Sequence, residues 1–449
     1  MKIINTKDYN SLHEVKQFLM RPHLDEVEVS PGAAARTKAI FGEVLTPEQS
    51  VERILKDVKL EGNTGLLRYI ERIDGVVLEE QDLLVGPLEM EAAMSKVSSE
   101  FLQSLNKAVE NVRAFHERQR ENSWFTADEN GVILGQRVIP MDRVGIYVPG
   151  GNAPLISTVV MSAIPARTAG VREIWMATPL RDGVIDPHLL AAAHVCGVTG
   201  IVKAGGAHAV GALAFGTATV PSVDKIVGPG NLFVTLAKKM VYGRVGIESL
   251  AGPSEVLVLA DETASPKYIA ADMLSQAEHD WEAASCLITT SQRVAEETAV
   301  ELQRQLAQLA TKEIAEVSLE RWGLLVVAQS MDEAVELTNI FAAEHLELLV
   351  ADPWKIMGRI RHAGAIFMGS LSSEPLGDYI AGPNHILPTN GTARFSSPLT
   401  TNDFVKKSSV LWFTEEGLAE SGPHAVNLAR LEGLDAHARA VQMRLDDLK

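Results

Sequence analysis

The strongest constraint on the fold is the alternation of short apolar segments with helical stretches after about residue 143. Seven such segments are predicted to be strands, at 144–148, 173–177, 201–203, 256–260, 286–289, 324–328 and 365–368. Strands separated by helices are typical of parallel βαβ units. We therefore expect an α/β protein with its functional residues just after a strand, or just after the helix that returns to the sheet.

The two ends of the chain are predicted to be helical. Residues from about 46 to 120 show helical spacing, and Thr46-Pro47-Glu48-Gln49 has the form of a capping box with proline at the first helical position. Residues 414–449 are rich in Ala, Leu, Glu and Arg, which predicts a small helical tail.

Composition excludes several classes of protein. The formal net charge of -17 disfavours nucleic acid as a partner, because an acidic surface repels phosphate backbones. No apolar run reaches the length of a membrane span, and the N-terminus has no apolar signal region, so we expect no membrane segment. Cys196 and Cys286 lie in apolar stretches, which favours buried free thiols and a reducing cytoplasm.

Two short segments carry residues suited to chemistry. Gln276 and His279 are three apart on a predicted helix, so both could bind one divalent cation, although an ordinary surface helix end would carry the same pair. Glu344 and His345 are natural general bases. Each segment reads Ala-Glu-His after a strand and a helix, a similarity that either duplication or chance explains.

Polar and glycine-rich loops supply further candidates. Asp378 and His385 lie in a loop with several glycines and a proline, which is either a site or an ordinary turn. Glycines at 150–151, 205–206 and 228–230 could approach a nucleotide. The complete G-x-G-x-x-G fingerprint is absent, as are a phosphate-binding P-loop and a nucleophile elbow.

Taken in order, these segments resemble the histidinol dehydrogenase family. The matching stretches are Val144-Gly-Ile-Tyr-Val-Pro-Gly-Gly151, Gly228-Pro-Gly-Asn231, Ala251-Gly-Pro-Ser-Glu255, Ser275-Gln-Ala-Glu-His-Asp280, Glu344-His-Leu346, Gly377-Asp-Tyr379 and Pro383-Asn-His385. The resemblance covers nearly the whole chain and is weakest before about residue 30. It implies an α/β fold with two incomplete Rossmann-like domains built on parallel-strand sheets, plus small N-terminal and helical C-terminal segments.

The resemblance also implies a division into domains. We expect an N-terminal segment at 1–27, a discontinuous main domain at 28–146 and 256–399, a second Rossmann-like domain at 147–255, and a dimer-contacting tail at 400–449.

The activity implied by the resemblance is the NAD-dependent oxidation of L-histidinol to L-histidine through L-histidinal, the last step of histidine biosynthesis. It implies one zinc ion per subunit, held by Gln276, His279, Asp378 and His437. His345 would accept the alcohol proton, and Glu344 would activate water on the aldehyde. The residues implied to contact substrate are Ser254, Gln276, His279, His345, Asp378, Glu432 and His437, and those implied to contact NAD are Tyr147, His208 and Asn231. In the family, His437 and Glu432 reach the site of the other subunit of a homodimer.

The sequence departs from the family pattern at three places. His208 stands where the family usually has Gln, and an imidazole cannot copy both hydrogen bonds of an amide. Glu248-Ser249-Leu250 and Pro375-Leu376 also differ from the usual residues. These departures leave open a related zinc- and NAD-dependent dehydrogenase of another small alcohol, such as a sulfonated diol, or a non-catalytic metal-binding dimer. Manganese or cobalt would also suit the ligands.

Overall fold

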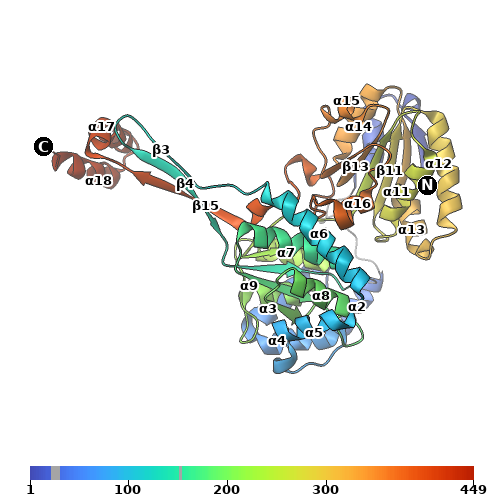
Figure 1. Cartoon of the computed structure of the whole chain (residues 1–449), viewed down its shortest axis with the longest axis horizontal. Helices are drawn as coiled ribbons and strands as arrows, with labels where there is room; N and C mark the ends of the chain where they lie inside the picture. Colours follow the sequence, from blue (N-terminus) through green and yellow to red (C-terminus); the bar gives the residue numbers. More distant parts are fainter. Residues whose placement is uncertain (22–30, 151–153, 449) are drawn as a thin grey trace.

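The computed structural model describes residues 1–21, 31–150 and 154–448, and within these ranges it contains two six-stranded sheets and one three-stranded sheet (Figure 1). The glycine-loop residues Gly151 and Asn152, and the domain boundary expected after residue 27, lie outside the described residues.

The first sheet is entirely parallel, in the order β1-β12-β11-β10-β13-β14. Its strands are β1 (Lys2–Asn5), β10 (Glu255–Ala260), β11 (Ala284–Thr289), β12 (Gly323–Val327), β13 (His345–Leu349) and β14 (Ala365–Met368). The helices around it are α1 (Leu12–Leu19), α11 (Pro266–Ala277), α12 (Gln292–Leu306), α13 (Lys312–Trp322), α14 (Met331–Phe341) and α15 (Pro353–Met357). Two apolar clusters bury this sheet, so its strands read as continuous apolar runs.

The second sheet has the order β2-β7-β6-β5-β8-β9 and is parallel except for β2. Its strands are β2 (Leu84–Val85), β5 (Arg143–Tyr147), β6 (Glu173–Thr178), β7 (Gly200–Lys203), β8 (Lys225–Val227) and β9 (Gly246–Ile247). Its helices include α7 (Ile156–Ala169), α8 (Pro187–Val195), α9 (Gly206–Phe215) and α10 (Leu232–Val241).

Both sheets follow the same course. Apart from the edge strands β1 and β2, the chain starts at a central strand, β5 or β10, adds two strands on one side, and then crosses back to add two on the other. This is the strand order of a Rossmann-like half, and it creates a switch point between β5 and β8 and another between β10 and β13. The expected fold class of two incomplete Rossmann-like domains is therefore confirmed, and all seven predicted strands are present within two residues of their expected ends.

Most helices of the N-terminal third pack on the second sheet. The helices α3 (Pro47–Glu61), α4 (Asn63–Tyr69), α5 (Pro87–Ala93) and α6 (Ser99–Glu117) pack on the second sheet. Val51 and Val58, for example, share a core with Leu213 of α9. The helix α6 also contacts the later part of the chain, because Asn111 donates to the carbonyl oxygen of Ile380. The extreme N-terminus is not a separate segment, because β1 pairs with β12 as the edge strand of the first sheet.

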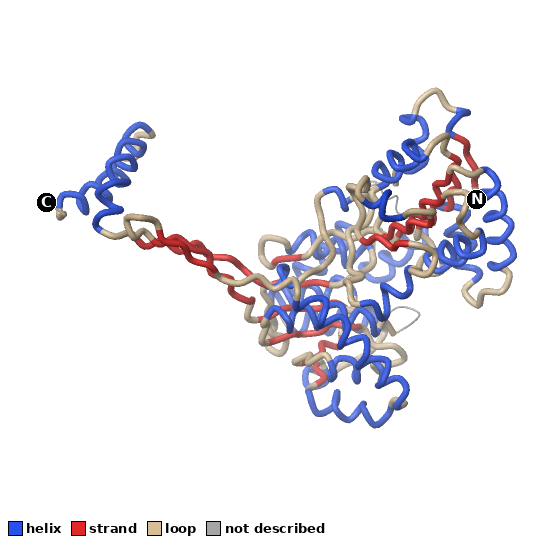
Figure 2. Tube along the Cα trace, turned by 45° about the horizontal axis from the view of Figure 1, so that its top comes forward, coloured by secondary structure: helices blue, strands red, loops and turns tan. Residues whose placement is uncertain are grey.

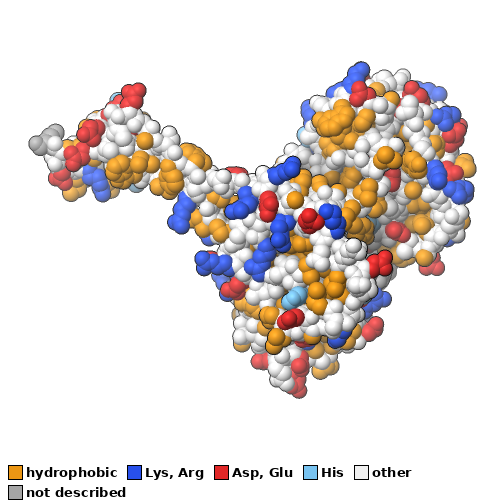
Figure 3. Space-filling model, in the orientation of Figure 1, with side chains coloured by type: hydrophobic (Ala, Val, Ile, Leu, Met, Phe, Trp, Pro, Cys, Tyr) orange, Lys and Arg blue, Asp and Glu red, His pale blue; other side chains and the backbone are white. Residues whose placement is uncertain are grey.

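A long antiparallel arm carries the C-terminal helices away from both sheets. It consists of β3 (Trp124–Ala127), β4 (Ile133–Pro140) and β15 (Val405–Trp412), with α17 (Glu415–Leu431) and α18 (Asp435–Asp446) at its end (Figure 2). The helical tail is thus confirmed, but it begins with a strand that sequence reasoning missed. Hydrophobic side chains are exposed along the arm (Figure 3), including Trp124, Phe125, Leu411, Trp412 and Phe413. No helix among the described residues has the length and apolar character to cross a membrane.

Candidate functional site

Glu344 and His345 lie at the amino end of β13, between β10 and the edge strand β14 of the first sheet. The helix α14 ends at Phe341, and Ala342 then adopts a left-handed conformation with φ of 56°, which turns the chain into the strand. A non-glycine residue with positive φ is uncommon and often marks a functional turn. Both side chains are about 95% buried. The pair therefore follows a returning helix, one of the two positions expected from the sequence, rather than the carboxyl end of a strand.

The hydrogen bond at Nδ1 determines which nitrogen of His345 can act as a base. Nδ1 lies 3.2 Å from the backbone carbonyl oxygen of Glu255, so it must donate there. The lone pair is therefore on Nε2, which is buried and has no hydrogen-bond partner among the described residues. Burial lowers the pKa of His345, although the nearby Glu374 carboxylate opposes this effect. The imidazole is thus neutral at neutral pH and ready to accept a proton.

Glu344 has the properties of a second base. Its Oε2 accepts a hydrogen bond of 2.9 Å from the backbone N–H of Glu255. Burial raises the pKa of Glu344 well above its usual value, and the neighbouring carboxylates of Glu255, Asp378 and Glu374 raise it further. A carboxylate with a raised pKa is a better proton acceptor near neutral pH than an ordinary glutamate.

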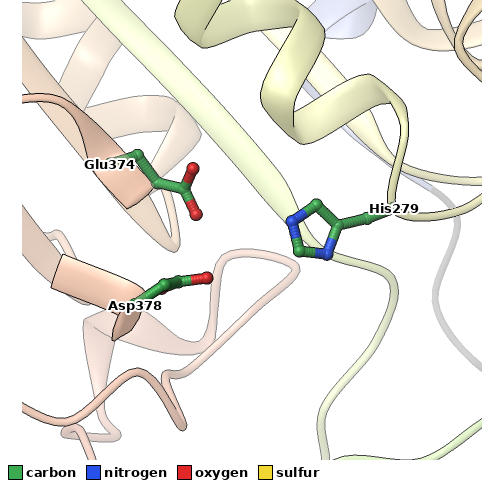
Figure 4. Close-up of side chains that lie close together, drawn as sticks. All are labelled: His279, Glu374 and Asp378. Carbon is green, nitrogen blue, oxygen red and sulfur yellow. The ribbon is translucent and has the colours of Figure 1, made fainter. Parts of the chain in front are cut away.

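Next to this pair, His279, Glu374 and Asp378 form a cluster with metal-ligand chemistry. One ligand atom from each lies within 4.8 Å of the other two, and the side chains point toward a common space (Figure 4). His279 follows the end of α11, whereas Glu374 and Asp378 come from the short helical segments Glu374–Leu376 and Gly377–Ala381. His345 Nε2 lies 3.9 Å from Glu374 and 3.8 Å from Asp378, so the cluster adjoins the two bases.

Unsatisfied polar groups around the cluster fit a bound divalent cation. Both amide atoms of Gln276, at the end of α11, are buried without a hydrogen-bond partner among the described residues, and so is Glu374 Oε1. Such groups are costly unless something binds them. Two buried carboxylates this close also repel each other unless a cation or a shared proton intervenes. The nitrogen and oxygen donors of Gln276, His279, Glu374 and Asp378 suit zinc.

The buried carboxyl groups of the cluster should make the stability of the folded protein depend on pH. Burial, and next the charge of Glu374, raise the pKa of Asp378 from 3.8 to about 9. The metal-free folded protein therefore holds a proton that the unfolded chain releases, and its stability should decrease as pH rises from about 4 to about 9. Zinc displaces this proton, so zinc affinity should increase over the same range.

The difference in Tm between zinc-loaded and metal-free protein should therefore widen as pH rises from about 6 to about 9. Differential scanning calorimetry measures it, and Asp378→Asn should make the difference nearly independent of pH. A difference that narrows with pH would contradict this interpretation.

Sequence reasoning missed Glu374 as a site residue. Glu374 and Asp378 are four residues apart, a spacing that places both side chains on one side of a helical segment. The side chain is almost completely buried, and its Oε2 accepts a hydrogen bond of 3.1 Å from the Ser275 hydroxyl, next to Gln276. That spacing was the available signal, but Pro375 and Gly377 between the two acidic residues hid the helical segment.

The residues expected to contact a nucleotide lie at the carboxyl ends of strands in the second sheet. Tyr147 ends β5, and Asn231 follows β8 and caps α10 through its side chain. The two therefore flank the switch point between β5 and β8. Gly228 has φ of 115°, and a Cβ there would lie 2.2 Å from the carbonyl oxygen of Tyr147. Only glycine allows this close approach of the loop to the strand.

His208 is fully buried in α9 and contacts an acidic residue. Its Nε2 lies 3.1 Å from Asp74 Oδ2, which also accepts a hydrogen bond of 3.1 Å from the backbone N–H of Gly205. The next N–H, that of Gly206, donates to the Tyr147 hydroxyl at 3.0 Å. His208 thus supports the glycine loop beside Tyr147, and its other nitrogen has no partner among the described residues.

Glu248, one of the departures from the family pattern, also supports a glycine loop. Its Oε1 accepts hydrogen bonds from Gly228 N at 2.8 Å and from Lys238 Nζ at 2.6 Å. The substitution is therefore accommodated by a buried ion pair beneath the loop.

The remaining predicted residues fall in two places. Ser254 immediately precedes β10, at the same edge of the first sheet as Glu344. Glu432 and His437 are exposed on the terminal helices. They lie at the end of the arm, far from the cluster of His279, Glu374 and Asp378 (Figure 1). A single chain therefore does not bring His437 to His279 and Asp378.

Comparisons with known proteins agree on one family. A model of the family described as histidinol dehydrogenase matches residues 42–445. The chain is 51% identical over 401 residues to a histidinol dehydrogenase of Halalkalibacterium halodurans, covering 89% of this chain and 94% of that protein. It is 48% identical to the one of Geobacillus kaustophilus, covering 94% of this chain and 99% of that protein. A crystal structure of histidinol dehydrogenase from Elizabethkingia anophelis is 37% identical, with a TM-score of 0.90, covering 100% of this chain and 98% of that one.

Proposed function

The chain belongs to the histidinol dehydrogenase family, and on that basis we propose that it oxidises L-histidinol to L-histidine, the last step of histidine biosynthesis, with reduction of two NAD. The observation that carries this proposal is the juxtaposition of a neutral imidazole base, His345, and a buried carboxylate base, Glu344, with a cluster of metal-binding side chains.

Zinc would be held by Gln276, His279 and Asp378 of one chain, with His437 of a second chain and the substrate nitrogens completing the site. When bound, it would act as a Lewis acid that anchors the imidazole and amino groups of histidinol. Glu374 faces the same space, so its carboxylate contributes negative charge beside the cation. Ser254 and the second chain's copy of Glu432 would bind the rest of the substrate, with a carboxylate suited to its ammonium group.

The two bases divide the proton transfers. In the first oxidation, Nε2 of His345 accepts the hydroxyl proton of histidinol while the hydride on the adjacent carbon leaves. In the second, Glu344 accepts a proton from water as the water oxygen bonds to the aldehyde carbon, and the hydrate then loses its hydride and a further proton. The nearly complete burial of both side chains keeps bulk water away from these steps.

NAD would lie over the carboxyl ends of β5 and β8, where it would accept the hydride when bound. Tyr147 and Asn231 would contact it there, because such switch points are where dinucleotides bind. His208 would contribute by supporting the loop at Gly205 and Gly206, since its ring nitrogen faces Asp74.

We also infer that the protein is a homodimer in which each tail completes the partner's site. The arm holds α17 and α18 far from the chain's own cluster and exposes several large hydrophobic side chains, which marks a surface for association. The two buried free thiols, Cys196 and Cys286, fit our proposal that the enzyme works in a reducing cytoplasm.

A substrate panel tests the proposed function. The zinc-loaded protein should turn over L-histidinol with a kcat/KM at least about a hundredfold above that for other small alcohols, including a sulfonated diol, because the cluster selects an imidazole-bearing substrate. Chelation should abolish activity, and added zinc should restore it. A protein that leaves histidinol untouched but reduces NAD with another alcohol has a different substrate, and one that oxidises no alcohol is not a dehydrogenase.

A further inference from the structure

Glu255, the first residue of β10, contacts both proposed bases through its backbone. Its N–H donates to Glu344 Oε2 at 2.9 Å, and its carbonyl oxygen accepts from His345 Nδ1 at 3.2 Å. These contacts follow from the register of the sheet, because Val256 of β10 pairs with His345 of β13. Small shifts of the backbone at residue 255 therefore move both bases.

The side chain of Glu255 is engaged by backbone groups from two other segments. The backbone N–H of Asn390 donates to Glu255 Oε1 at 3.1 Å, and the backbone N–H groups of Glu344 and Gly391 lie close enough to the same carboxylate to oppose the rise in its pKa that burial causes. Glu344 therefore accepts the backbone N–H of Glu255, and the backbone N–H of Glu344 lies close to the Glu255 carboxylate in return. Since the Glu255 oxygens are occupied by backbone donors, this carboxylate is not free to act on substrate.

A positively charged side chain from the N-terminal part of the chain, Arg21, lies beside the Glu255 carboxylate. The guanidinium of Arg21 lies 3.9 Å from Glu255 Oε2, donates to the carbonyl oxygens of Pro253 and Glu282, and stacks on Trp322 with 4.7 Å to the ring centre. Both partners of this ion pair are almost completely buried. A buried ion pair with so many satisfied hydrogen bonds fixes geometry more than it adds stability.

We propose that Glu255 is a positioning residue that holds the Glu344 carboxylate for the second oxidation, and that Arg21 keeps Glu255 in place. This inference rests on the proposed function, because it assigns the two oxidations to different bases. The contact to His345 comes from the backbone carbonyl, which any residue at 255 provides. The contact to the Glu344 backbone comes from the Glu255 side chain, so a side-chain substitution acts mainly through Glu344.

A substitution of the Glu255 side chain should slow the second oxidation, because that step uses Glu344. In this step water loses one proton to Glu344 while its oxygen bonds to the aldehyde carbon of histidinal. The resulting hydrate anion gives its hydride to the second NAD and loses a further proton, leaving the carboxylate. The first oxidation needs no water and uses His345.

The test is a rapid-mixing measurement of NADH formation by the zinc-loaded enzyme with histidinol, for Glu255→Gln and for the wild type. The amide lacks the negative charge, and one of the two acceptor oxygens, that the surrounding N–H groups and Arg21 face. The second NADH should therefore form about 10- to 100-fold more slowly, while the first forms within about threefold of the wild-type rate. A burst of one NADH per site should therefore appear. Zinc content should stay within about threefold, and so should kcat/KM for histidinol, which reports the first oxidation.

Two further variants keep the test decisive. Arg21→Met should slow the second step in the same direction but less, and it serves if Glu255→Gln does not fold. Ser285→Ala is the matched control, because its buried hydroxyl lies in the same sheet on β11 and donates to Met273 O without touching Glu344. It should leave both steps unchanged.

An equal loss in both steps, or no loss in either, would overturn the positioning role. A wild-type protein that does not oxidise histidinol would instead overturn the proposed function, so the two failures are distinguishable.

Discussion

Replacing His345 by Asn should lower kcat for histidinol by about a thousandfold, because it removes the base proposed to accept the alcohol proton. The amide N–H of asparagine can still donate to the carbonyl oxygen of Glu255, as Nδ1 of His345 does at 3.2 Å. The substitution therefore removes Nε2 and little else, and it leaves Gln276, His279 and Asp378 intact.

Zinc content, measured by metal analysis, and Tm should stay close to wild type in this variant. His188→Asn is the control, since His188 contacts Asp186 at the start of α8, a helix of the other sheet, far from the bases. A His345→Asn protein that keeps more than about a tenth of wild-type kcat would show that another group accepts the proton.

Mixing two inactive variants should restore activity if the tail completes the partner's site. His345→Asn removes a base from the part of the site that lies at the first sheet. His437→Ala removes only the metal ligand that the tail contributes. In a dimer containing one chain of each, the His437→Ala chain supplies an intact His345, and the tail of the His345→Asn chain supplies an intact His437 to the same site. One of the two sites is then complete.

With random pairing, half of the dimers are mixed, so the mixture should reach about a quarter of wild-type activity per site. The chains should be unfolded and refolded together, and NADH formation should be compared with that of each variant refolded alone. Activity no greater than the average of the two separate variants would show that each chain uses its own tail. The same mixing with wild-type chains provides the upper control.

Local sequence patterns predicted the parts of the fold that depend on local residues. The buried strands of both sheets are continuous apolar runs between turns, and each of the seven predicted strands is present. The capping box at Thr46 starts α3 as predicted, with Gln49 and Thr46 each bonded to the other's backbone.

Longer-range features were not predictable from such patterns. The arm pairs β4 with β15, whose residues are more than 260 positions apart, and most of its side chains are exposed, so neither strand shows an apolar run. The helices between 47 and 117 have an apolar face that would suit either sheet, and only the tertiary structure shows that they cover the second one.

The residues of the candidate site were likewise predictable only in part from the sequence. Glu344 and His345 were identified before their setting was known, because their residue types suit proton transfer. Their position after the helix that returns to the sheet was expected, but the strand β13 that begins at His345 was not predicted. The contribution of Glu374 and Glu255 depends on burial and on contacts with residues distant in the sequence, which no local pattern reveals.

The central claim is that one site carries out both oxidations, and the most direct test is to count NADH. A known, limiting amount of L-histidinol should be converted to completion by the zinc-loaded wild-type protein with excess NAD, and the products measured. The account predicts two NADH and one L-histidine for each histidinol consumed. One NADH per histidinol, with histidinal as the product, would contradict it.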